Sequence, residues 1–400
     1  MSIPDTSSSG TPSAGTASYF GVSATDQARR RAALRNKIIA DHLDALLVTD
    51  LINIRYLTGF TGSNAALLIA ATRDDADLLV TDSRYEIQAG EEAPDLPLKI
   101  ERACDIAAAV HAGTEYAATG QVAALRLGFE EHLMTVARHQ SVATALADVG
   151  TAAVPGAKLT AAGGLVETLR EVKDASEIAA LRRASEITDA ALAEFIAAGG
   201  LRAGRTEREA ALDLDERMRR LGADEIAFPT ILAAGENSAI PHHQPTDRPL
   251  KAGDLVKIDF GAMWHGYHAD MTRVFVLGAP ADWQRDLHTL VATAQQTGRD
   301  ALLPGVTISD VDSAARDIIA AAGHGQHFGH GLGHGVGLEI HEAPWFAPKS
   351  HGIIKADMTV TVEPGVYLSG QGGVRIEDSG VVGPDGYEPL TLSPRDLVQI

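Results

Sequence analysis

The chain has little cysteine, a shortage of basic residues and no long hydrophobic segment, and each of these features excludes a class of protein. Cys104 is the single cysteine among 400 residues, so an internal disulfide framework is excluded and a reducing compartment, the cytoplasm, is expected. Lys and Arg number 34, against 53 Asp and Glu. The resulting net charge of -19 disfavours nucleic acid and anionic membrane as partners, because both attract a basic face. No apolar run approaches the roughly 18 residues that a membrane-spanning helix needs.

The N-terminal segment, MSIPDTSSSGTPSAGTASYF, is rich in Ser, Thr and Gly. It lacks the apolar core of a signal peptide, so we predict a disordered tail over residues 1–19. The length of the chain predicts two or three domains, and its 45% hydrophobic and 22% charged residues are ordinary for a soluble globular protein. We expect an α/β domain over residues 20–157 and a second domain over residues 165–400.

Short apolar runs alternate with helical patterns in the N-terminal part of the chain, which predicts an α/β domain with a partly parallel sheet. The segment YLTGFTGSNA, at 56–65, is predicted to be a loop between two strands, and the small, Gly-rich stretch at 151–164 a linker between the domains. Strands are predicted at 45–49, 65–70, 77–81 and 125–129, and helices at 24–41 and 135–147.

The second domain contains an internal repeat, in which three marker residues recur after 101 positions. A helical pattern follows the second marker in each copy. It starts with a Thr206–Glu209 capping box in the first copy and a weaker Thr307–Asp310 version in the second. We therefore predict an α+β domain of two similar halves, with a cleft on their pseudo-two-fold axis. The markers are Gly204, Thr206 and Gly222 in one copy and Gly305, Thr307 and Gly323 in the other.

Two aspartates lie in the segment 255–278, which is predicted to form two apolar strands joined by a turn at Met263–Gly266. An antiparallel pairing symmetric about that turn would set Asp259 opposite Asp270. Asp is a poor strand residue, and two facing carboxylates repel each other unless a cation lies between them. A surface position beside the turn is an alternative for Asp270, but it suits Asp259 poorly because apolar residues flank it.

A second hairpin is predicted at 358–382, with its turn at Gly370–Gly373. It carries Glu363 on one strand and Glu377 on the other. The midpoint between these glutamates is displaced from the centre of the turn, so we expect a β-bulge or a diagonal pairing. Two hairpins with one carboxylate on each strand match the two repeated halves.

Alternating glycines and four histidines fill the segment between the hairpins, HFGHGLGHGVGLEIHE at 327–342. Alternating glycines let another backbone or a substrate approach closely. We expect one or two of the histidines to bind metal, and Trp345 to border the substrate site. The segment has no phosphate-binding glycine pattern, and the sequence lacks the HExxH motif of zincins and the GxSxG motif of serine hydrolases. The histidines are His327, His330, His334 and His341.

Four carboxylates and one imidazole favour a divalent cation, with manganese first and zinc or cobalt as alternatives. Four carboxylates and a bridging hydroxide carry five negative charges, of which two divalent ions neutralise four. The sequence therefore predicts two ions, which would acidify a bound water and stabilise an oxyanion.

Five motifs resemble, in order, those of the pita-bread metallopeptidases, and in particular the proline-specific branch of prolidase and aminopeptidase P. They are IDFG, ADMTR, HGLGHGVGLEIHE, EPGVY and GVRIED. In the N-terminal part, NIRYLTGFTGSNA and TDSRY also look like that branch. The resemblance covers nearly everything after the tail. It implies a creatinase-type N-terminal domain, a pita-bread C-terminal domain like that of creatinase and methionine aminopeptidase, and hydrolysis of the Xaa-Pro bond at the N-terminus of a peptide.

The resemblance assigns the metal ligands by position. Asp259, Asp270 and Glu377 would bind the first ion, and Asp270, His334, Glu363 and Glu377 the second. The bridging, metal-bound hydroxide would attack the carbonyl before proline, and Glu363 would take the proton of the water.

Further residues match the family's substrate and supporting positions. His242 and His341 would steady the scissile carbonyl and the tetrahedral intermediate, although His243 neighbours His242 and could be confused with it. The other matches are His330, which would line the pocket, and Tyr367 and Arg375, which would orient the site.

The resemblance implies short proline-containing peptides with a free α-amino group as substrates, and a homodimer or a dimer of dimers. Residues 53–64 would form a lid, from the same or a neighbouring chain. Asn53 stands where some aminopeptidase P members carry an acidic residue, which leans mildly toward a dipeptidase and leaves an Xaa-Pro aminopeptidase as the open alternative. Methionine aminopeptidase is the nearest enzymatic alternative, but it normally lacks the N-terminal domain. A non-catalytic binding module is another alternative, although such relatives have degraded ligand sets and all five ligands are present here.

Overall fold

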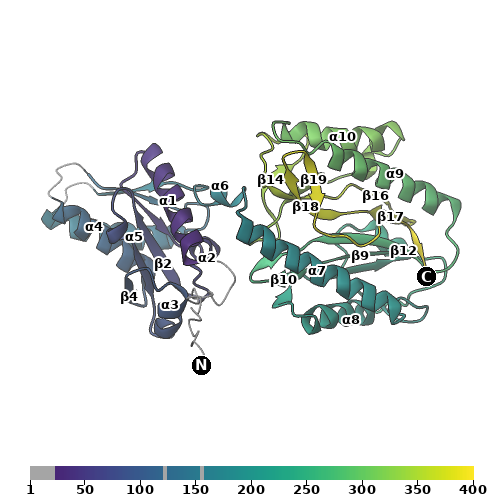
Figure 1. Cartoon of the computed structure of the whole chain (residues 1–400), viewed down its shortest axis with the longest axis horizontal. Coiled ribbons are helices and arrows are strands. Elements are labelled where there is room, and N and C mark those ends of the chain that lie inside the picture. The colour runs from purple at the N-terminus through teal and green to yellow at the C-terminus, as the bar shows by residue number, and fades with distance from the viewer. Residues whose placement is uncertain (1–22, 120–123, 154–156) are drawn as a thin grey trace, which may run out of the picture.

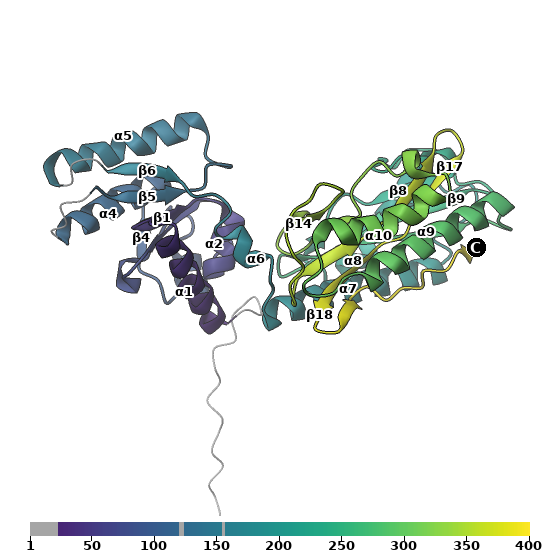
Figure 2. The ribbon, with the colours of Figure 1, turned by 90° about the horizontal axis from the view of Figure 1, so that it is seen from above.

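The computed structural model describes residues 23–119, 124–153 and 157–400, which form two domains lying side by side (Figures 1 and 2). The tail predicted for residues 1–19 lies outside these ranges. Within them, no helix has both the length and the apolar composition that crossing a bilayer requires.

The N-terminal domain is built on a six-stranded sheet with strand order β4-β3-β2-β1-β5-β6. The central strand β1 is antiparallel to β2 and parallel to β5, so the prediction of a partly parallel sheet is confirmed. The strands are β1 (Ala45–Val48), β2 (Ala65–Ala70), β3 (Leu78–Thr81), β4 (Leu98–Ile100), β5 (Arg126–Phe129) and β6 (Lys158–Ala161). The helices are α1 (Ala24–Ala40), α2 (Leu51–Thr58), α3 (Glu86–Glu92), α4 (Cys104–Ala118) and α5 (Val136–Ala153), with a 3-10 turn η1 (Asp74–Ala76).

Two predictions for this domain are wrong. The expected loop at 56–65 begins inside α2, because Asp50 caps that helix through the Ile52 amide and Gly59 ends it with a φ of 81°. The expected linker at 151–164 contains β6, which pairs with β5 and extends the sheet beyond the boundary drawn at 157. β6 is a largely exposed edge strand, so it lacks the apolar pattern that would reveal it.

The C-terminal domain consists of two halves, each with a pair of helices outside a set of strands. In Figure 1, α7 and α8 lie along one side of the domain and α9 and α10 along the other. The predicted repeat is confirmed, since α8 begins and ends 101 residues before α10. The helices are α6 (Glu167–Arg170), which follows the first domain, and α7 (Ala175–Ala197), α8 (Glu207–Arg220), α9 (Asp282–Asp300) and α10 (Ile308–Ala321), with 3-10 turns η2 (Gly235–Ala239) and η3 (Gly325–His327).

The strands of the two halves belong to separate sheets. One sheet has the order β20-β12-β9-β8 and the other β14-β13-β15-β18-β19, with the short ribbons β11-β10-β7 and β16-β17 beside them. The first half contains β7 (Glu225–Ile226), β8 (Ile231–Ala234), β9 (Leu255–Phe260), β10 (Ala262–Trp264), β11 (Tyr267–His268) and β12 (Met271–Val276). The second contains β13 (Gly333–Gly335), β14 (Glu342–Phe346), β15 (Thr359–Val362), β16 (Gly365–Leu368), β17 (Gly372–Arg375), β18 (Asp378–Gly383) and β19 (Gly386–Pro389), and β20 (Val398–Gln399) returns to the first sheet.

The helix caps of the repeat differ from each other. Thr206 and Glu209 form the predicted capping box of α8. The weaker version expected for α10 is wrong, because the Thr307 side chain makes no cap hydrogen bond. The Asp310 amide instead donates to the Thr307 carbonyl oxygen, 3.1 Å away.

Both carboxylate-bearing ribbons have a register different from the expected one. Asp259 pairs with Thr272 across β9 and β12, so Asp259 and Asp270 lie diagonally on one face. The turn is the two-residue His265–Gly266, whose φ values of 50° and 78° are typical of a type I′ turn.

In the second half, one register runs unbroken through the pairs β15/β18 and β16/β17. It places Glu363 directly opposite Glu377, so the expected bulge or diagonal pairing is wrong. The reason is that the turn is centred on Gly370, whose φ is 75°.

The two halves are joined where their ribbons meet. The Glu377 amide donates to the Thr272 carbonyl oxygen at 3.2 Å, and the Ser379 hydroxyl donates to the Asp270 carbonyl oxygen at 2.8 Å. The neighbouring Asp378 carboxylate is fully buried and accepts hydrogen bonds from Arg273 and Gln295, each at 2.7 Å, and from Arg395.

Buried polar contacts around Arg170 connect the two domains. Its guanidinium donates to Asn53 of α2 at 2.9 Å and to Glu342 of β14 at 2.6 Å. Lys173 donates to the same Glu342 carboxylate at 2.6 Å. Asn53 is itself fully buried and does not line the cavity of the C-terminal domain. No residue of the range 53–64 lines that cavity, so a lid from the same or a neighbouring chain stays a prediction.

We expect Asp378→Ala to lower the free energy of unfolding by about 3–5 kcal/mol, because it leaves buried guanidinium groups without a counter-charge. Burial raises the pKa of Asp378, but Arg273 and Arg395 outweigh it and hold the pKa below its ordinary value. Urea unfolding of the metal-free protein measures the loss. Arg182→Ala is the control, because it removes only a surface ion pair with Glu388 and should change stability by less than about 1 kcal/mol. Equal losses in the two variants would contradict this account.

Candidate metal centre

All five predicted ligands line one cavity of about 800 Å³ in the C-terminal domain. They come from both halves. Asp259 lies in β9 and Asp270 immediately precedes β12, while His334 lies in β13. Glu363 follows β15, and Glu377 lies between β17 and β18.

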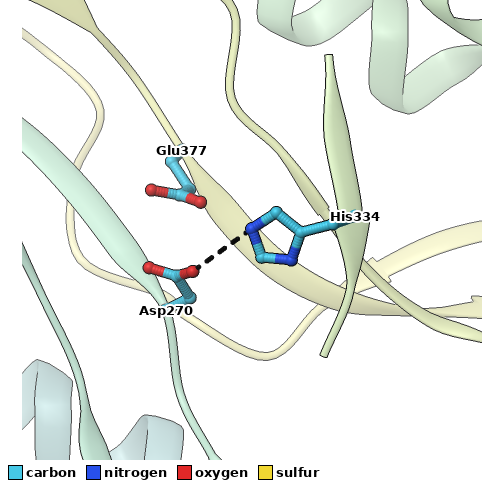
Figure 3. A group of neighbouring side chains, drawn as sticks. All are labelled: Asp270, His334 and Glu377. Carbon is cyan, nitrogen blue, oxygen red and sulfur yellow. Dashed lines mark ion pairs between the residues drawn. The ribbon is translucent and has the colours of Figure 1, made fainter. Parts of the chain in front are cut away.

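Asp270, His334 and Glu377 point toward one another (Figure 3). Each offers a ligand atom, and these atoms all lie within 4.8 Å of one another. His334 Nε2 is 3.6 Å from Asp270 Oδ2 and 3.2 Å from Glu363 Oε1. Its other nitrogen, Nδ1, faces the Gly335 carbonyl oxygen at 3.0 Å. That contact orients the imidazole and leaves Nε2 as the nitrogen directed at the carboxylates.

Burial and mutual repulsion make this cluster of carboxylates unfavourable by itself. Burial, followed by the neighbouring carboxylates, raises the pKa of Asp270 and of Glu377 well above the ordinary range. Burial also raises the pKa of Glu363, but the hydrogen bond and the charge of His334 outweigh it and bring the pKa down to about 2. Asp259 Oδ1 is buried and has no hydrogen-bond partner among the described residues. An unpartnered carboxylate oxygen within a buried anionic group fits divalent cations.

One oriented chain of hydrogen bonds runs away from the carboxylates. Arg375 pairs with Asp259 and donates to the Tyr367 hydroxyl oxygen at 2.8 Å. The Tyr367 oxygen lies 2.9 Å from His330 Nε2, and His330 Nδ1 lies 2.8 Å from the Gly331 carbonyl oxygen. Burial lowers the pKa of His330, and a neutral ring that donates from Nδ1 accepts the tyrosine proton at Nε2. The three residues predicted to line and orient the site therefore form a single network.

The remaining predicted histidines separate into two groups. His242 and His341 both line the cavity, and the His341 ring centroid is 4.4 Å from that of His334. Burial, followed by the charge of His334, lowers the pKa of His341. His243 instead contacts Glu207 at 2.8 Å. The structure therefore assigns the cavity position to His242 and a packing position to His243.

Sequence reasoning missed two residues that support the site. The Thr272 hydroxyl donates to Glu377 at 2.7 Å and accepts from Arg375 Nε at 3.0 Å. Lys257 is fully buried, and its ammonium donates to the carbonyl oxygens of Ile240 at 2.7 Å and Pro241 at 3.1 Å, immediately before His242. A lysine among apolar strand residues was a usable signal, whereas a threonine in a strand carries none.

Comparison with known proteins identifies the C-terminal domain. Residues 179–384 match the model of metallopeptidase family M24. The chain belongs to this family. Residues 30–172 match the creatinase/prolidase N-terminal domain, so the M24 domain follows a second recognised domain. The family and the fold implied by the sequence motifs, a creatinase-type domain followed by a pita-bread domain, are confirmed. As an M24 metallopeptidase, the chain is a hydrolase that acts with divalent metal ions.

Relatives of this M24 protein match it over nearly its full length. A Xaa-Pro dipeptidase of Pyrococcus horikoshii is 33% identical over 89% of this chain and 95% of its own. The solved structure of a Xaa-Pro dipeptidase from Bacillus anthracis is 34% identical, with a TM-score of 0.84 over 94% of this chain and 100% of that one. The X-Pro aminopeptidase structure from Thermotoga maritima is also 34% identical, with a TM-score of 0.80 over 92% of this chain and 99% of that one.

We expect Asp270→Ala to lower metal affinity by more than about tenfold. Mutation of a residue that only hydrogen-bonds to a metal ligand costs about 10–100-fold in affinity, and Asp270 is itself a proposed ligand. Equilibrium dialysis against manganese, followed by elemental analysis, measures the affinity. Asp282→Ala is the matched control, since its carboxylate is almost fully exposed on α9. Unchanged manganese binding by folded Asp270→Ala would remove Asp270 from the metal centre.

We expect Tyr367→Phe to slow hydrolysis. The shape of the pH–rate profile below about pH 11, including any alkaline limb, should stay the same. Burial raises the pKa of Tyr367 to about 12, so the phenol keeps its proton and titrates only above that range. Steady-state kinetics from pH 6 to 10 provide the profile. Disappearance of an alkaline limb in the variant would mean that Tyr367 ionises during turnover.

Proposed function

We propose that this protein hydrolyses the Xaa-Pro peptide bond at the N-terminus of short peptides, with two divalent metal ions. The observation that carries the proposal is the set of four carboxylates and one imidazole facing a single cavity in an M24 chain. Proteins named Xaa-Pro dipeptidase and X-Pro aminopeptidase resemble it over almost the whole length. The creatinase/prolidase N-terminal domain supports this function over that of a methionine aminopeptidase.

The five residues fit two ions as the sequence motifs imply. Asp259, Asp270 and Glu377 would hold the first, and His334 and Glu363 would join Asp270 and Glu377 at the second. When bound, the ions acidify a water molecule and polarise the scissile carbonyl group. Oxygen ligands with one imidazole favour manganese, and zinc or cobalt are alternatives.

The chain's own side chains would move protons and hold the peptide. Glu363 lies beside His334 at the cavity wall, where its carboxylate would accept the proton given up by the attacking water and pass it to the leaving proline nitrogen. His242 and His341 would donate hydrogen bonds to the carbonyl oxygen as negative charge develops on it. Arg375 would keep Asp259 in place through their ion pair.

Three further properties stay predictions from the sequence: manganese as the physiological metal, assembly as a homodimer or dimer of dimers, and a cytoplasmic location. A non-catalytic binding role is the alternative of a different class. This alternative would be favoured if the manganese-loaded protein hydrolysed no Xaa-Pro peptide.

We expect His341→Ala to retain bound metal and to lose about 100-fold or more in kcat, the scale of one donor to a developing oxyanion. Elemental analysis and steady-state hydrolysis of Ala-Pro-Ala, with Ala-Ala-Ala as the comparison substrate, measure both properties. His243→Ala is the matched control, because that ring contacts Glu207 away from the cavity. A parallel loss of metal would contradict the role of His341. Equal rates on the two substrates for the unmodified protein would contradict the proposed proline specificity.

A further inference from the structure

We propose that the natural substrates are peptides of three or more residues, so that the protein acts as an aminopeptidase and not as a dipeptidase. This inference rests on the proposed Xaa-Pro peptidase function. It replaces the preference for a dipeptidase expected from Asn53, which is buried and does not line the cavity. It concerns the α-carboxyl group of the proline residue. In a dipeptide that group is a free carboxylate close to the scissile bond, whereas in a longer peptide it is a neutral amide.

A dipeptide would bring its C-terminal carboxylate into a cavity whose two proposed divalent ions are already balanced by the four carboxylates and a bound hydroxide. Burying that charge requires a cationic partner, because an isolated buried carboxylate is strongly unfavourable. Among the described residues that line the cavity, Arg375 is the single guanidinium, and none is a lysine.

Every nitrogen of Arg375 is already engaged. Nε donates to Thr272 at 3.0 Å and Nη2 to Asp259. Nη1 donates to Tyr367 at 2.8 Å and to the Pro241 carbonyl oxygen at 3.3 Å. The guanidinium of Arg375 therefore donates to groups of the site itself. It has no pair of adjacent N–H groups left to bind a substrate carboxylate.

The cavity histidines do not replace it, since His242 and His341 are the proposed donors to the scissile carbonyl oxygen. Both nitrogens of His330 are in hydrogen bonds, and His334 faces the carboxylate cluster. The His341 ring packs against the His334 ring, with 4.4 Å between ring centroids. His327 Nδ1 is 3.2 Å from His324 Nδ1, and its Nε2 is 3.4 Å from Gln326 Nε2, so both ring nitrogens already face groups of the chain.

The cavity mouth instead offers apolar surface. Trp345 is a lining residue whose side chain is 54% exposed, although it lies opposite His334 in the β13–β14 pairing. Its ring centroid is 6.3 Å from that of His341. Phe228, Pro229 and Ile340 add further apolar lining. Each residue beyond proline carries the chain end about 3.3–3.6 Å outward, which moves the terminal carboxylate toward solvent and lays neutral backbone and side chains over this surface.

The test compares three substrates on the manganese-loaded protein: Ala-Pro, Ala-Pro-amide and Ala-Pro-Ala. We expect kcat/KM for both the amide and the tripeptide to exceed that for Ala-Pro by about tenfold or more, the scale of one uncompensated charge in a partly buried site. A higher kcat/KM for Ala-Pro than for the other two would overturn the inference while leaving Xaa-Pro hydrolysis intact. Hydrolysis of none of the three would overturn the proposed function together with the inference.

A pair of variants tests the charge argument separately. Trp345→Lys places an ammonium group at the mouth, and Trp345→Gln removes the same indole without adding charge. For each variant, kcat/KM for Ala-Pro is divided by kcat/KM for Ala-Pro-amide. We expect this ratio to be several-fold higher in Trp345→Lys than in Trp345→Gln. Added salt should reduce the difference between the two variants. An identical ratio in the two variants would contradict the idea that a missing cation excludes dipeptides.

Discussion

The architecture of this protein depends on one electrostatic constraint, the placement of four carboxylates in a buried cluster. Carboxylates in such a position repel one another and lose their hydration, so they require positive charge nearby. Arg375 supplies part of it to Asp259. In the metal-free site a protonated His334 supplies another part to Glu363, and metal binding displaces that proton. Asp270 and Glu377, whose pKa values are raised most by burial and by their neighbours, are left for bound cations. The negative charge of the site is therefore not balanced until divalent ions bind.

The duplicated fold explains how the chain gathers so much negative charge at one point. Each half contributes a two-stranded ribbon with an acidic residue on each strand, and hydrogen bonds between Thr272 and Glu377 and between Ser379 and Asp270 hold the ribbons together. The free energy for this arrangement comes from two apolar cores, one under each helix pair. Asp259 and His334 lie in strands, and the other three ligands lie directly beside strand ends, so the sheets hold all five side chains in place, as a catalytic metal centre requires.

Much of this organisation could be predicted from the sequence. The 101-residue repeat and the helical patterns predicted α8 and α10 because both helices carry an apolar face, and α8 also carries a capping box. The ligand set followed from acidic residues inside apolar strands and from the family motifs. Strand register could not be predicted as well. The His265–Gly266 turn needs a positive φ at a histidine, and the turn at Gly370 is one of several equivalent glycines in SGQGG. Contacts between distant segments, such as Thr272 with Arg375 or Arg170 with Glu342, leave no periodic signal in the chain.

The most direct test of the central claim is anomalous X-ray diffraction at the manganese edge from crystals of the manganese-loaded protein. We expect two anomalous peaks in the cavity, one bounded by Asp259 and the other by His334, with Asp270 and Glu377 between them. A loaded crystal with no peak among these side chains, or with manganese bound elsewhere on the chain, would contradict that claim.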